Sequence, residues 1–276
     1  MTVTKEHLLA FRNHLRIEEK SPATQEKYLR DTAMFATYAG EQEITKELVL
    51  GWKQYLIEKN YAVRSINSML ASVNSFLDFF ELGFCKVKNL RIQRQTYCAE
   101  EKELSKAEYF RLLTAAKGDE QLSLVLQTIC ATGIRVSEVQ HFTVEAVKQG
   151  MVIVHCKNKT RNILVPSKLK KQLLNYAKKE GKSSGVIFTG KTGKPLNRSY
   201  IWAAMKKLCN AANVIPSKVF PHNLRKLFAR AFYAMEKDIA KLADILGHSS
   251  INTTRIYIMT TGREHLQKLE QLKLII

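Results

Sequence analysis

The spacing of apolar residues in the first 82 positions is the feature that most restricts the fold. Apolar side chains recur there every three or four residues in four segments, which is the period of an amphipathic helix. The first segment starts at Thr4, and Ser21 and Thr45 can cap the next two. The fourth segment runs from about Val63 to Leu82. Four short helices joined by brief turns predict a small all-α domain.

Helix patterns continue in the rest of the chain. The sequence Ser105-x-x-Glu108 is a capping box, and a strongly apolar segment follows from Leu122 to Ala131. Further helices are predicted after Arg135 and at Ser199–Ala212, Asn223–Met235, Ile239–Leu246, Thr253–Thr260 and Glu264–Ile276. The second part of the chain should therefore also be mostly helical.

A small amount of β-pattern interrupts these helices. Met151–His155 and Asn162–Val165 are short and rich in β-branched residues, which predicts the two strands of a hairpin. Residues 157–161 would then form a basic tip, and Val186–Phe188 can add a third strand. We expect a chain that is mostly α with a small antiparallel β-sheet.

Helical periodicity fades between residues 84 and 99, which indicates a division into domains. We expect an N-terminal domain at 1–83, a linker at 84–99 and a second domain at 100–276, because 276 residues suit two cores. The linker carries four basic residues, Lys86, Lys88, Arg91 and Arg94. Their charges would suit a segment lying on phosphates, although a solvated connector explains them equally well.

The charge of the chain favours a polyanionic partner. Lys and Arg number 44 against 25 Asp and Glu, a net charge of +19, and residues 97–276 hold 30 − 14 = +16 of it. Nucleic acid is the first candidate for such a field. A membrane is a poorer candidate, because no polybasic run flanks a membrane-spanning segment. Ribosomal association and a merely solvated basic surface are further alternatives.

Two features of the sequence, its cysteines and its N-terminus, indicate the cellular compartment of the protein. The five cysteines include no Cys-x-x-Cys pair, which favours reduced thiols over a disulfide frame or a zinc site. The N-terminus lacks a signal-peptide pattern, and no stretch approaches 18 apolar residues. We therefore expect a soluble cytoplasmic protein with no membrane partner.

Several polar residues of the second part could act on a phosphodiester, whose transfer requires cations on the non-bridging oxygens, a nucleophile and a proton donor. Arg135 lies near a glycine at a predicted helix start, where backbone can approach a ligand closely. An ion pair with Glu138 is a slightly simpler explanation. His222 and Arg225 lie on one helix face and could bind two oxygens of one phosphate, unless they are only a cap and a surface arginine.

The remaining candidates lie at the hairpin tip and near the C-terminus. Lys157 or Lys159 could donate a proton to an alkoxide, but lysines on hairpin tips are commonly just exposed. His248 follows a glycine and precedes Tyr257 by nine residues. Taken alone, His248 is by default a histidine at a helix end without a role, and Tyr257 can simply be a core residue. No Asp/Glu cluster resembles a two-metal nuclease site, which favours a metal-free route.

Taken together, the order and spacing of these residues resemble the tyrosine recombinase family, which includes lambda-integrase-like and Xer-type recombinases. Residues 131–138, ATGIRVSE, are similar to the family's A-T-G-x-R-x-S-E box, and Glu138 matches its acidic residue, which would orient the site. Residues 246–257, LGHSSINTTRIY, are similar to the L-G-H-x-x…T-T-x-x-Y box. The resemblance covers nearly the whole chain. It implies an N-terminal four-helix SAM-like core-binding domain and a C-terminal mixed α/β catalytic domain.

The resemblance implies a role for each matching residue. Tyr257 would attack a DNA phosphate and form a 3′-phosphotyrosyl link, releasing a 5′-hydroxyl. Arg135 and Arg225 would hold the non-bridging oxygens, while His222 and His248 would position the phosphate and assist proton transfer. The link keeps the bond energy, so no metal, ATP or other cofactor is expected.

Two departures from the family pattern concern the hairpin and the segment after Arg225. The hairpin sequence C-K-N-K at residues 156–159 is one residue shorter than the common G-K-G-x-K. Lys157 is favoured as the acid that protonates the leaving 5′-oxygen, with Lys159 as its rival. Lys159 and Arg161 are also candidate DNA contacts. The residues K-L at 226–227 stand where the family usually has a histidine and then Ser or Thr, which should affect packing more than activity.

The resemblance also implies assembly on double-stranded DNA. Residues 262–276 look like the family's C-terminal helix that docks on a neighbouring protomer, so we expect a tetramer on two sites. A helix packed on its own domain is the alternative. No arm-binding domain precedes the first helix, which indicates the two-domain form. Type IB topoisomerase-like relaxation and a non-catalytic DNA-binding role are alternative functions. Integration, excision, inversion and dimer resolution are not distinguished, and the DNA target is not given.

Overall fold

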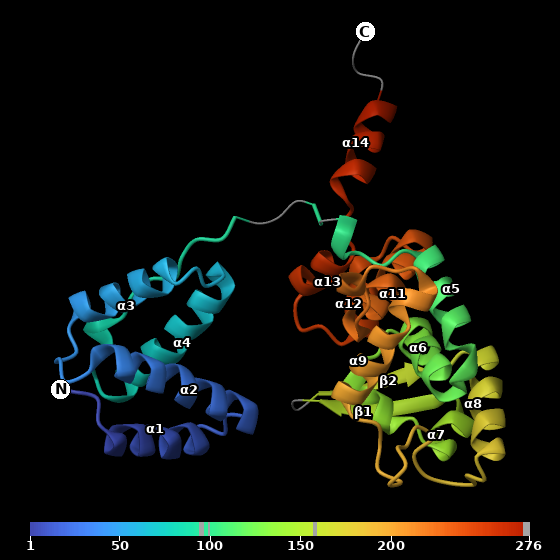
Figure 1. Ribbon diagram of the computed structural model, residues 1–276, viewed down its shortest axis with the longest axis horizontal. Helices are drawn as coiled ribbons and strands as arrows, with labels where there is room; N and C mark the ends of the chain where they lie inside the picture. Colours follow the sequence, from blue (N-terminus) through green and yellow to red (C-terminus); the bar gives the residue numbers. More distant parts are fainter. Residues whose placement is uncertain (94–96, 99, 157–158, 273–276) are drawn as a thin grey trace. The chain divides into compact units, whose positions relative to one another are not determined.

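The computed structural model describes residues 1–93, 97–98, 100–156 and 159–272, and the chain divides into two compact units, Met1–Arg94 and Gln95–Ile276. Each unit has a hydrophobic core of its own. The first is helical in its described part, whereas the second combines helices with a two-stranded sheet (Figure 1). A mostly helical chain with a small antiparallel sheet is thereby confirmed.

Four helices form the first unit, as the apolar spacing predicts. They are α1 (Lys5–Ile17), α2 (Pro22–Ala39), α3 (Lys46–Glu58) and α4 (Val63–Phe79), followed by the 3-10 helix η1 (Gly83–Cys85). The side-chain oxygens of Thr4, Ser21 and Thr45 cap the first three helices by accepting hydrogen bonds from the backbone three residues on. The apolar faces meet around Trp52 and Phe76, which are both buried.

The chain continues to pack on the first unit beyond its fourth helix. Val87 enters the core of this unit. The side-chain amides of Asn74 and Asn67 bind the backbone of Val87 and Leu90 respectively, as both donor and acceptor, with N···O distances between 2.8 and 3.3 Å. The segment expected to be a linker, residues 84–99, therefore begins as packed chain that is held by amides rather than by helical periodicity.

The second unit has helices before and after a hairpin. Its α-helices are α5 (Lys106–Ala115), α6 (Glu120–Thr132), α7 (Val144–Gln149), α8 (Ser167–Lys179), α9 (Arg198–Lys207), α10 (Cys209–Ala212), α11 (Pro221–Met235), α12 (Ile239–Leu246), α13 (Ile251–Tyr257) and α14 (Gly262–Gln271). Its 3-10 helices are η2 (Glu100–Lys102), η3 (Ala116–Gly118), η4 (Val136–His141) and η5 (Pro216–Lys218). Among the α-helices, α7 and α8 are absent from the prediction, as are the 3-10 helices η2, η3 and η5.

The sheet consists of β1 (Met151–Cys156) and β2 (Lys159–Leu164), which pair antiparallel along their whole length. The second strand begins earlier than predicted, so residues 159–161 belong to the ladder and not to the tip. Backbone pairing does not require apolar side chains, which explains the difference. The expected third strand is wrong, because Val186 makes only an isolated bridge, with Thr143, within the described chain.

Two other predicted helices differ in detail. The helix expected after Arg135 is the 3-10 helix η4, and the carboxylate of Glu138 closes its start by accepting a 2.7 Å hydrogen bond from the backbone N–H of Arg135. The helix expected at 199–212 is divided at Leu208 into α9 and α10. The helix predicted at 253–260 is α13, which begins at Ile251 and ends at Tyr257. Tyr257 therefore lies on its last turn.

Helix α6 runs through the core of the second unit and packs against both α8 and α11. The approach to α11 is closest at Gly133, which ends α6 with φ +64°. A Cβ at this position would lie 2.4 Å from the ring of Phe228 on α11, so both the conformation and the space require glycine. The turn after α6 therefore lies directly against the helix that carries His222 and Arg225.

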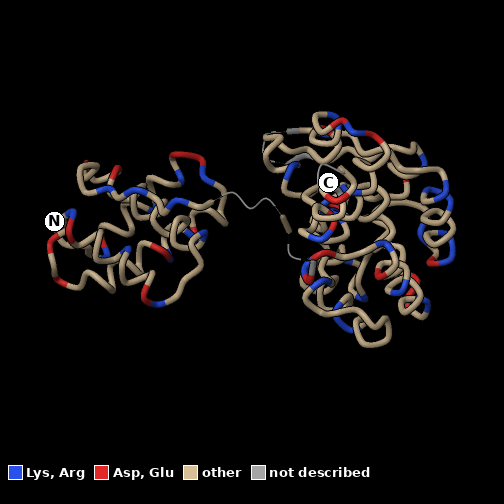
Figure 2. Tube along the Cα trace, turned by 90° about the horizontal axis from the view of Figure 1, so that it is seen from above, with Lys and Arg blue, Asp and Glu red and all other residues tan. Residues whose placement is uncertain are grey.

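Charged residues occur throughout the chain, although residues 97–276 carry most of the net positive charge. Lys and Arg positions are spread along both units, with Asp and Glu positions between them (Figure 2). No helix within the described ranges is long and apolar enough to cross a membrane. Across those same ranges, no three His, Cys, Asp or Glu side chains gather as metal ligands would. The excess of basic residues, a net charge of +19, favours a polyanionic partner.

Candidate active site

Three segments that are distant in sequence meet at Arg225, near the start of α11. Its guanidinium donates hydrogen bonds to the carbonyl oxygens of Gly133 (2.5 Å) and Leu246 (2.6 Å), which end α6 and α12. The residue is 1% exposed. Burial, together with the nearby charge of Arg135, lowers the pKa of Arg225 to about 10. The side chain is therefore a buried cation at neutral pH.

Glu138 holds two more guanidinium groups at the same place. Its carboxylate, on a residue that is 3% exposed, accepts a 3.0 Å hydrogen bond from Arg135 and a shorter one from Arg161. Burial alone would raise the pKa of Glu138, but the backbone N–H of Arg135 and the two cations hold it below its usual range. Arg135 also donates to the carbonyl oxygen of Gly247 (3.2 Å) and keeps 36% of its side chain exposed.

His248 lies between Arg225 and the buried Thr254. Its Nε2 is 3.0 Å from Nη2 of Arg225, and its Nδ1 is 2.9 Å from Oγ1 of Thr254. A guanidinium can only donate, so Nε2 is the unprotonated nitrogen and the Nδ1–H donates to Thr254. Partial burial and the neighbouring guanidinium groups lower the pKa of His248 to about 4. The imidazole is therefore neutral near pH 7.

Tyr257 lies between two imidazole rings. The ring centroids of His222 and His248 are both 4.8 Å from its own, in edge-to-face arrangements. The phenolic oxygen is 3.3 Å from Nδ1 of His222, and the guanidinium carbon of Arg225 is 5.8 Å from the ring centre. Tyr257 is 8% exposed and packs on a small core formed by α11 and α12. It is thus a core residue whose hydroxyl lies at His222 and whose ring lies beside the guanidinium of Arg225.

A cavity of about 350 Å³ opens beside this group and is lined by Arg135, His222 and Arg225. Three other lining residues were not singled out from the sequence: Arg198, Trp202 and Phe220. Trp202 is 49% exposed and lies at the edge of this cationic cavity. Nothing in the sequence around Trp202 indicates that exposure, because it depends on how α9 packs.

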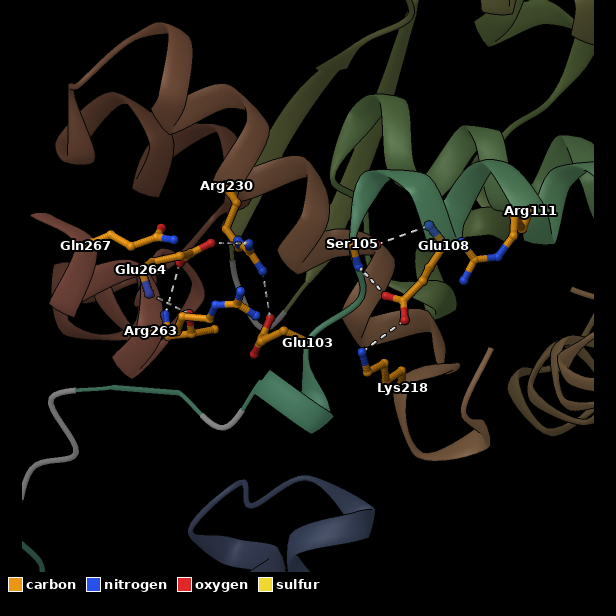
Figure 3. A pocket seen from close by; sticks show the side chains of 10 residues that line it. Glu103, Ser105, Glu108, Arg111, Lys218, Arg230, Arg263, Glu264 and Gln267 are labelled. Carbon is orange, nitrogen blue, oxygen red and sulfur yellow. Dashed lines mark hydrogen bonds and ion pairs between the residues drawn. The ribbon is translucent and has the colours of Figure 1, made fainter. Parts of the chain in front are cut away.

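A larger cavity, of about 520 Å³, lies at the base of α14 (Figure 3). Its lining contains three acidic residues, and each of them has a cationic partner there: Glu108 pairs with Lys218 at 2.9 Å, and Glu103 and Glu264 each pair with Arg230 at 3.5 Å. The lining of the first cavity contains three arginines and no acidic residue. The first cavity is therefore the better candidate for binding a phosphate.

The hairpin candidates are placed only in part. Lys157 lies outside the described residues, and Lys159 is described only as the first residue of β2. Arg161 donates to the carbonyl oxygen of Ile245 (2.5 Å) and to Glu138, so its own chain occupies the guanidinium. Its side chain is 13% exposed, unlike the tip residue that the sequence predicts.

The basic residues of the expected linker have different surroundings. Lys86 pairs with Asp78 at 2.8 Å, whereas Lys88 and Arg91 are exposed. Arg94 lies outside the described residues. Of the four linker residues predicted to contact DNA phosphates, Lys88 and Arg91 are thus exposed on the surface of the first unit.

Family models match both units of the chain. The model of the phage integrase family matches residues 102–263, which is more than half of the chain. The chain belongs to the phage integrase family. This is the tyrosine recombinase family that the two motifs indicate. The model of the family's N-terminal SAM-like domain matches residues 8–81, so the four-helix unit of this recombinase is also identified.

Curated relatives match over nearly their whole length. The tyrosine recombinase XerA of Pyrococcus furiosus is 26% identical over 99% of this chain and 96% of its own. The tyrosine recombinase XerD of Halalkalibacterium halodurans is 28% identical over 95% of each chain. A solved lambda integrase dimer bound to a COC′ core site has a TM-score of 0.76 at 16% identity, covering 95% of this chain and 97% of that one. That likeness shows the fold of this recombinase.

Proposed function

We propose that this tyrosine recombinase cuts and rejoins double-stranded DNA at specific sites, with Tyr257 as its nucleophile. The observation that carries the proposal is the phenolic oxygen of Tyr257, which lies 3.3 Å from Nδ1 of His222 beside the buried Arg225. A phosphodiester presents two non-bridging oxygens with one negative charge. The guanidinium groups of Arg225 and Arg135 line one cavity and supply donors for both oxygens.

In the proposed reaction the phenolic oxygen of Tyr257 attacks phosphorus, and the bond from phosphorus to the 5′-oxygen breaks. The products are a 3′-phosphotyrosyl link and a 5′-hydroxyl, so one P–O bond replaces another. Attack by the 5′-hydroxyl of a second strand reverses the step and releases the tyrosine. Because the link retains the energy of the phosphodiester, rejoining consumes no ATP and needs no metal.

The phenolic proton of Tyr257 needs an acceptor, and His222 is placed to be one. Partial burial, and then the charges of Lys226 and Arg225, hold the pKa of His222 below its ordinary value. Its imidazole is then neutral near pH 7 and has a lone pair for the proton. Both ring nitrogens of His248 are already engaged, so we assign His248 to holding Arg225 and the phosphate in position.

The leaving 5′-oxygen needs a proton donor, for which we propose Lys157, with Lys159 as the rival. A substrate with a 5′-bridging phosphorothiolate separates them, because a thiolate leaves without being protonated. This substrate should restore cleavage by Lys157→Ala but not by Arg135→Ala. Restoration of Lys159→Ala instead would assign the acid to Lys159.

Double-stranded DNA as partner is supported by the net charge of +19 and by the cationic cavity. We propose the SAM-like unit, residues 1–83, as the core-binding domain and residues 100–276 as the catalytic domain. Lys88, Arg91 and Arg94 would contact the DNA backbone from the segment between them. Binding should then weaken steeply with salt, and a flat salt response would contradict backbone contacts. A cytoplasmic location is part of the proposal.

Assembly through α14 is also proposed, with a second copy of this chain as the occupant of its apolar face. Leu266, Leu269 and Leu272 recur at helical spacing and are 56%, 49% and 57% exposed. The helix is attached at its base, where Arg230 pairs with Glu264 (Figure 3). Changing the three leucines to serine should leave the monomer folded and weaken the tetramer on DNA. An unchanged tetramer would place the contact elsewhere.

The decisive test is Tyr257→Phe, which removes one oxygen and keeps the ring packing. The variant should bind cognate duplex like the parent protein and leave no covalent protein–DNA adduct on a denaturing gel. A persistent adduct would assign the nucleophile to another residue. Topoisomerase-like relaxation and a non-catalytic role are not favoured by the comparisons, because the curated relatives described above are recombinases.

A further inference from the structure

Arg161 is a largely buried arginine whose donors point into its own protein. It lies on β2 with its side chain 13% exposed. Nη1 donates to the carbonyl oxygen of Ile245 on α12 (2.5 Å), and Nη2 donates to Oε2 of Glu138 on η4. Its Nε is buried without a hydrogen-bond partner among the described residues. One side chain thus connects the hairpin to the two turns that frame the site.

The backbone beyond α12 is shaped to receive this side chain. Gly247 has φ +63°, the left-handed conformation that closes a helix. A Cβ there would lie 2.7 Å from Cδ of Arg161, so a side chain at this position would displace the arginine. The carbonyl oxygen of the same glycine accepts a hydrogen bond from Arg135, and His248 follows it in the chain.

We propose that Arg161 is a positioning residue for the recombination reaction. It fixes the carboxylate of Glu138, which in turn holds Arg135, and it fixes the turn that leads to His248. The proposal rests on the proposed function, because the groups that it positions are those assigned to the scissile phosphate. It also ties β2, the strand that follows Lys157 in the sequence, to the end of α12.

A direct contact between Arg161 and DNA is the competing interpretation, and the bonds of its guanidinium argue against it. Turning the side chain to a phosphate would remove a cation from Glu138, which is 3% exposed. It would also remove the donor from the carbonyl oxygen of Ile245. Breaking a buried ion pair and leaving a buried acceptor unpaired are both unfavourable.

The arrangement requires arginine rather than any cation. The guanidinium is planar, and its two terminal nitrogens reach a carbonyl and a carboxylate at once. A lysine has one nitrogen on a flexible stem and can hold one of these partners in the same geometry, but not both. Lysine nevertheless preserves the charge, and a phosphate contact through charge alone tolerates it. Arg161→Lys therefore separates the two interpretations.

The experiment measures covalent cleavage of a suicide duplex by full-length protein in a single turnover at saturating enzyme, and the dissociation constant at fixed salt. For Arg161→Lys we expect cleavage to fall by about 10²-fold, because small misplacement of reacting groups has that effect. The dissociation constant should change less than about twofold. Lys168→Ala, which removes one exposed charge on α8, serves as the control and should cleave like the parent. Parental cleavage by Arg161→Lys would overturn the proposal, as would a loss explained entirely by weaker binding.

A second variant keeps the proposal testable if lysine disturbs folding. Arg161→Ala should lose at least as much cleavage, and added guanidinium should restore part of it by filling the vacated position. Guanidinium at the same concentration should not accelerate Lys168→Ala. Absence of rescue in a variant with a parental melting temperature would contradict positioning by the guanidinium. If the parent protein itself forms no adduct, the proposed function fails, which is distinct from failure of the role of Arg161.

Discussion

In the first unit the buried carboxylate of Asp31 is neutralised within its own helices, whereas in the second unit the equally buried guanidinium of Arg225 bonds only neutral groups among the described residues. Asp31, 1% exposed, accepts hydrogen bonds from Lys27 and from Ser72 (2.9 Å). Lys27 also donates to the carbonyl oxygen of Ser68 (3.1 Å). Arg30, whose side chain is 69% exposed, also lies 3.4 Å from the carboxylate. These contacts tie α2 to α4 and neutralise the buried charge of Asp31.

The second unit keeps a charge that it does not cancel. Arg135 and Arg161 pair with the carboxylate of Glu138, while the guanidinium of Arg225 bonds the carbonyl oxygens of Gly133 and Leu246, so three cations and one anion leave 3 − 1 = +2. The paired charge of Asp31 stabilises the packing of two helices, whereas the excess positive charge around Arg225 is available to bind an anion. Keeping cations so close together reduces stability, which is the common cost of a preorganised site.

The largest effect should follow from changing the unpaired cation. Arg225→Lys retains the charge but cannot bridge the carbonyl oxygens of Gly133 and Leu246 while facing a phosphate. We expect single-turnover cleavage to fall by about 10³-fold, or about 4 kcal/mol in the barrier. Arg12→Lys, at an exposed position of the first unit, is the matched control. If the two variants cleaved DNA at the same rate, the positive charge at position 225 would suffice for cleavage. The fixed guanidinium of the second unit would then have no special role compared with an exposed arginine of the first.

Changing the paired charge should affect stability instead. Asp31→Ala leaves Lys27 without its carboxylate and should destabilise the first unit by about 3 kcal/mol. Hydrogen exchange of the full chain should show faster exchange in α2 and α4 and unchanged exchange in α11. Asp78→Ala, which breaks the exposed pair with Lys86, should cost less than about 1 kcal/mol. Equal losses in both units would mean that they unfold as one.

An added anion should stabilise one unit and not the other. Inorganic phosphate at ten times its dissociation constant contributes RT ln 11, about 1.4 kcal/mol, to the state that binds it. We expect slower hydrogen exchange in α11 and α12, and no change in α2 or α4. Chloride at equal ionic strength controls for screening, and Arg225→Lys should weaken the response. Equal protection of both units would indicate a general salt effect.

The features that could be predicted from the sequence are those with local causes. Caps and apolar spacing define the four helices of the first unit. Two motifs indicate Arg135, His248 and Tyr257, and the spacing of His222 and Arg225 indicates that pair. Helix α8, which is absent from the prediction, has the same kind of spacing at Leu169, Leu173 and Tyr176. Its lysines make the segment polar overall, although the local signal for a helix is present.

Other features depend on contacts between distant segments. The sequence pattern predicts a strand that starts at Asn162, which would leave Arg161 at the exposed tip of the hairpin. Once β2 is extended to its observed start, alternation places Arg161 on the same face as Ile163, which is 4% exposed. The places of Trp202 and Arg198 beside the site follow from the packing of α9, which no local pattern reports. Sequence therefore locates the reacting groups better than the groups that hold them.

The smallest expected effect concerns pH. The pKa of His248 lies at about 4, below the 6.5 of an ordinary histidine, because of burial and the guanidinium groups around it. Between these values the unfolded chain binds a proton that the folded chain does not, so the stability contributed at this position rises as pH increases from about 4 to 6.5 and is constant above. Allowing for solvent screening at a partly exposed site, we expect about 1 kcal/mol.

Comparing the parent protein with His248→Gln isolates this contribution, because titrations elsewhere cancel in the difference. The free energy of unfolding of the parent protein minus that of His248→Gln should increase with pH up to about 6.5 and then level off. The matched control is His141→Gln, which makes the same substitution at the end of η4. A difference for His248→Gln that stays constant from pH 4.5 to 8 would mean that the guanidinium groups do not act on this imidazole. Solvent would then screen the excess positive charge of the second unit. The arginine cluster and the Asp31 group would in that case differ in the arrangement of their side chains and not in their electrostatic effect.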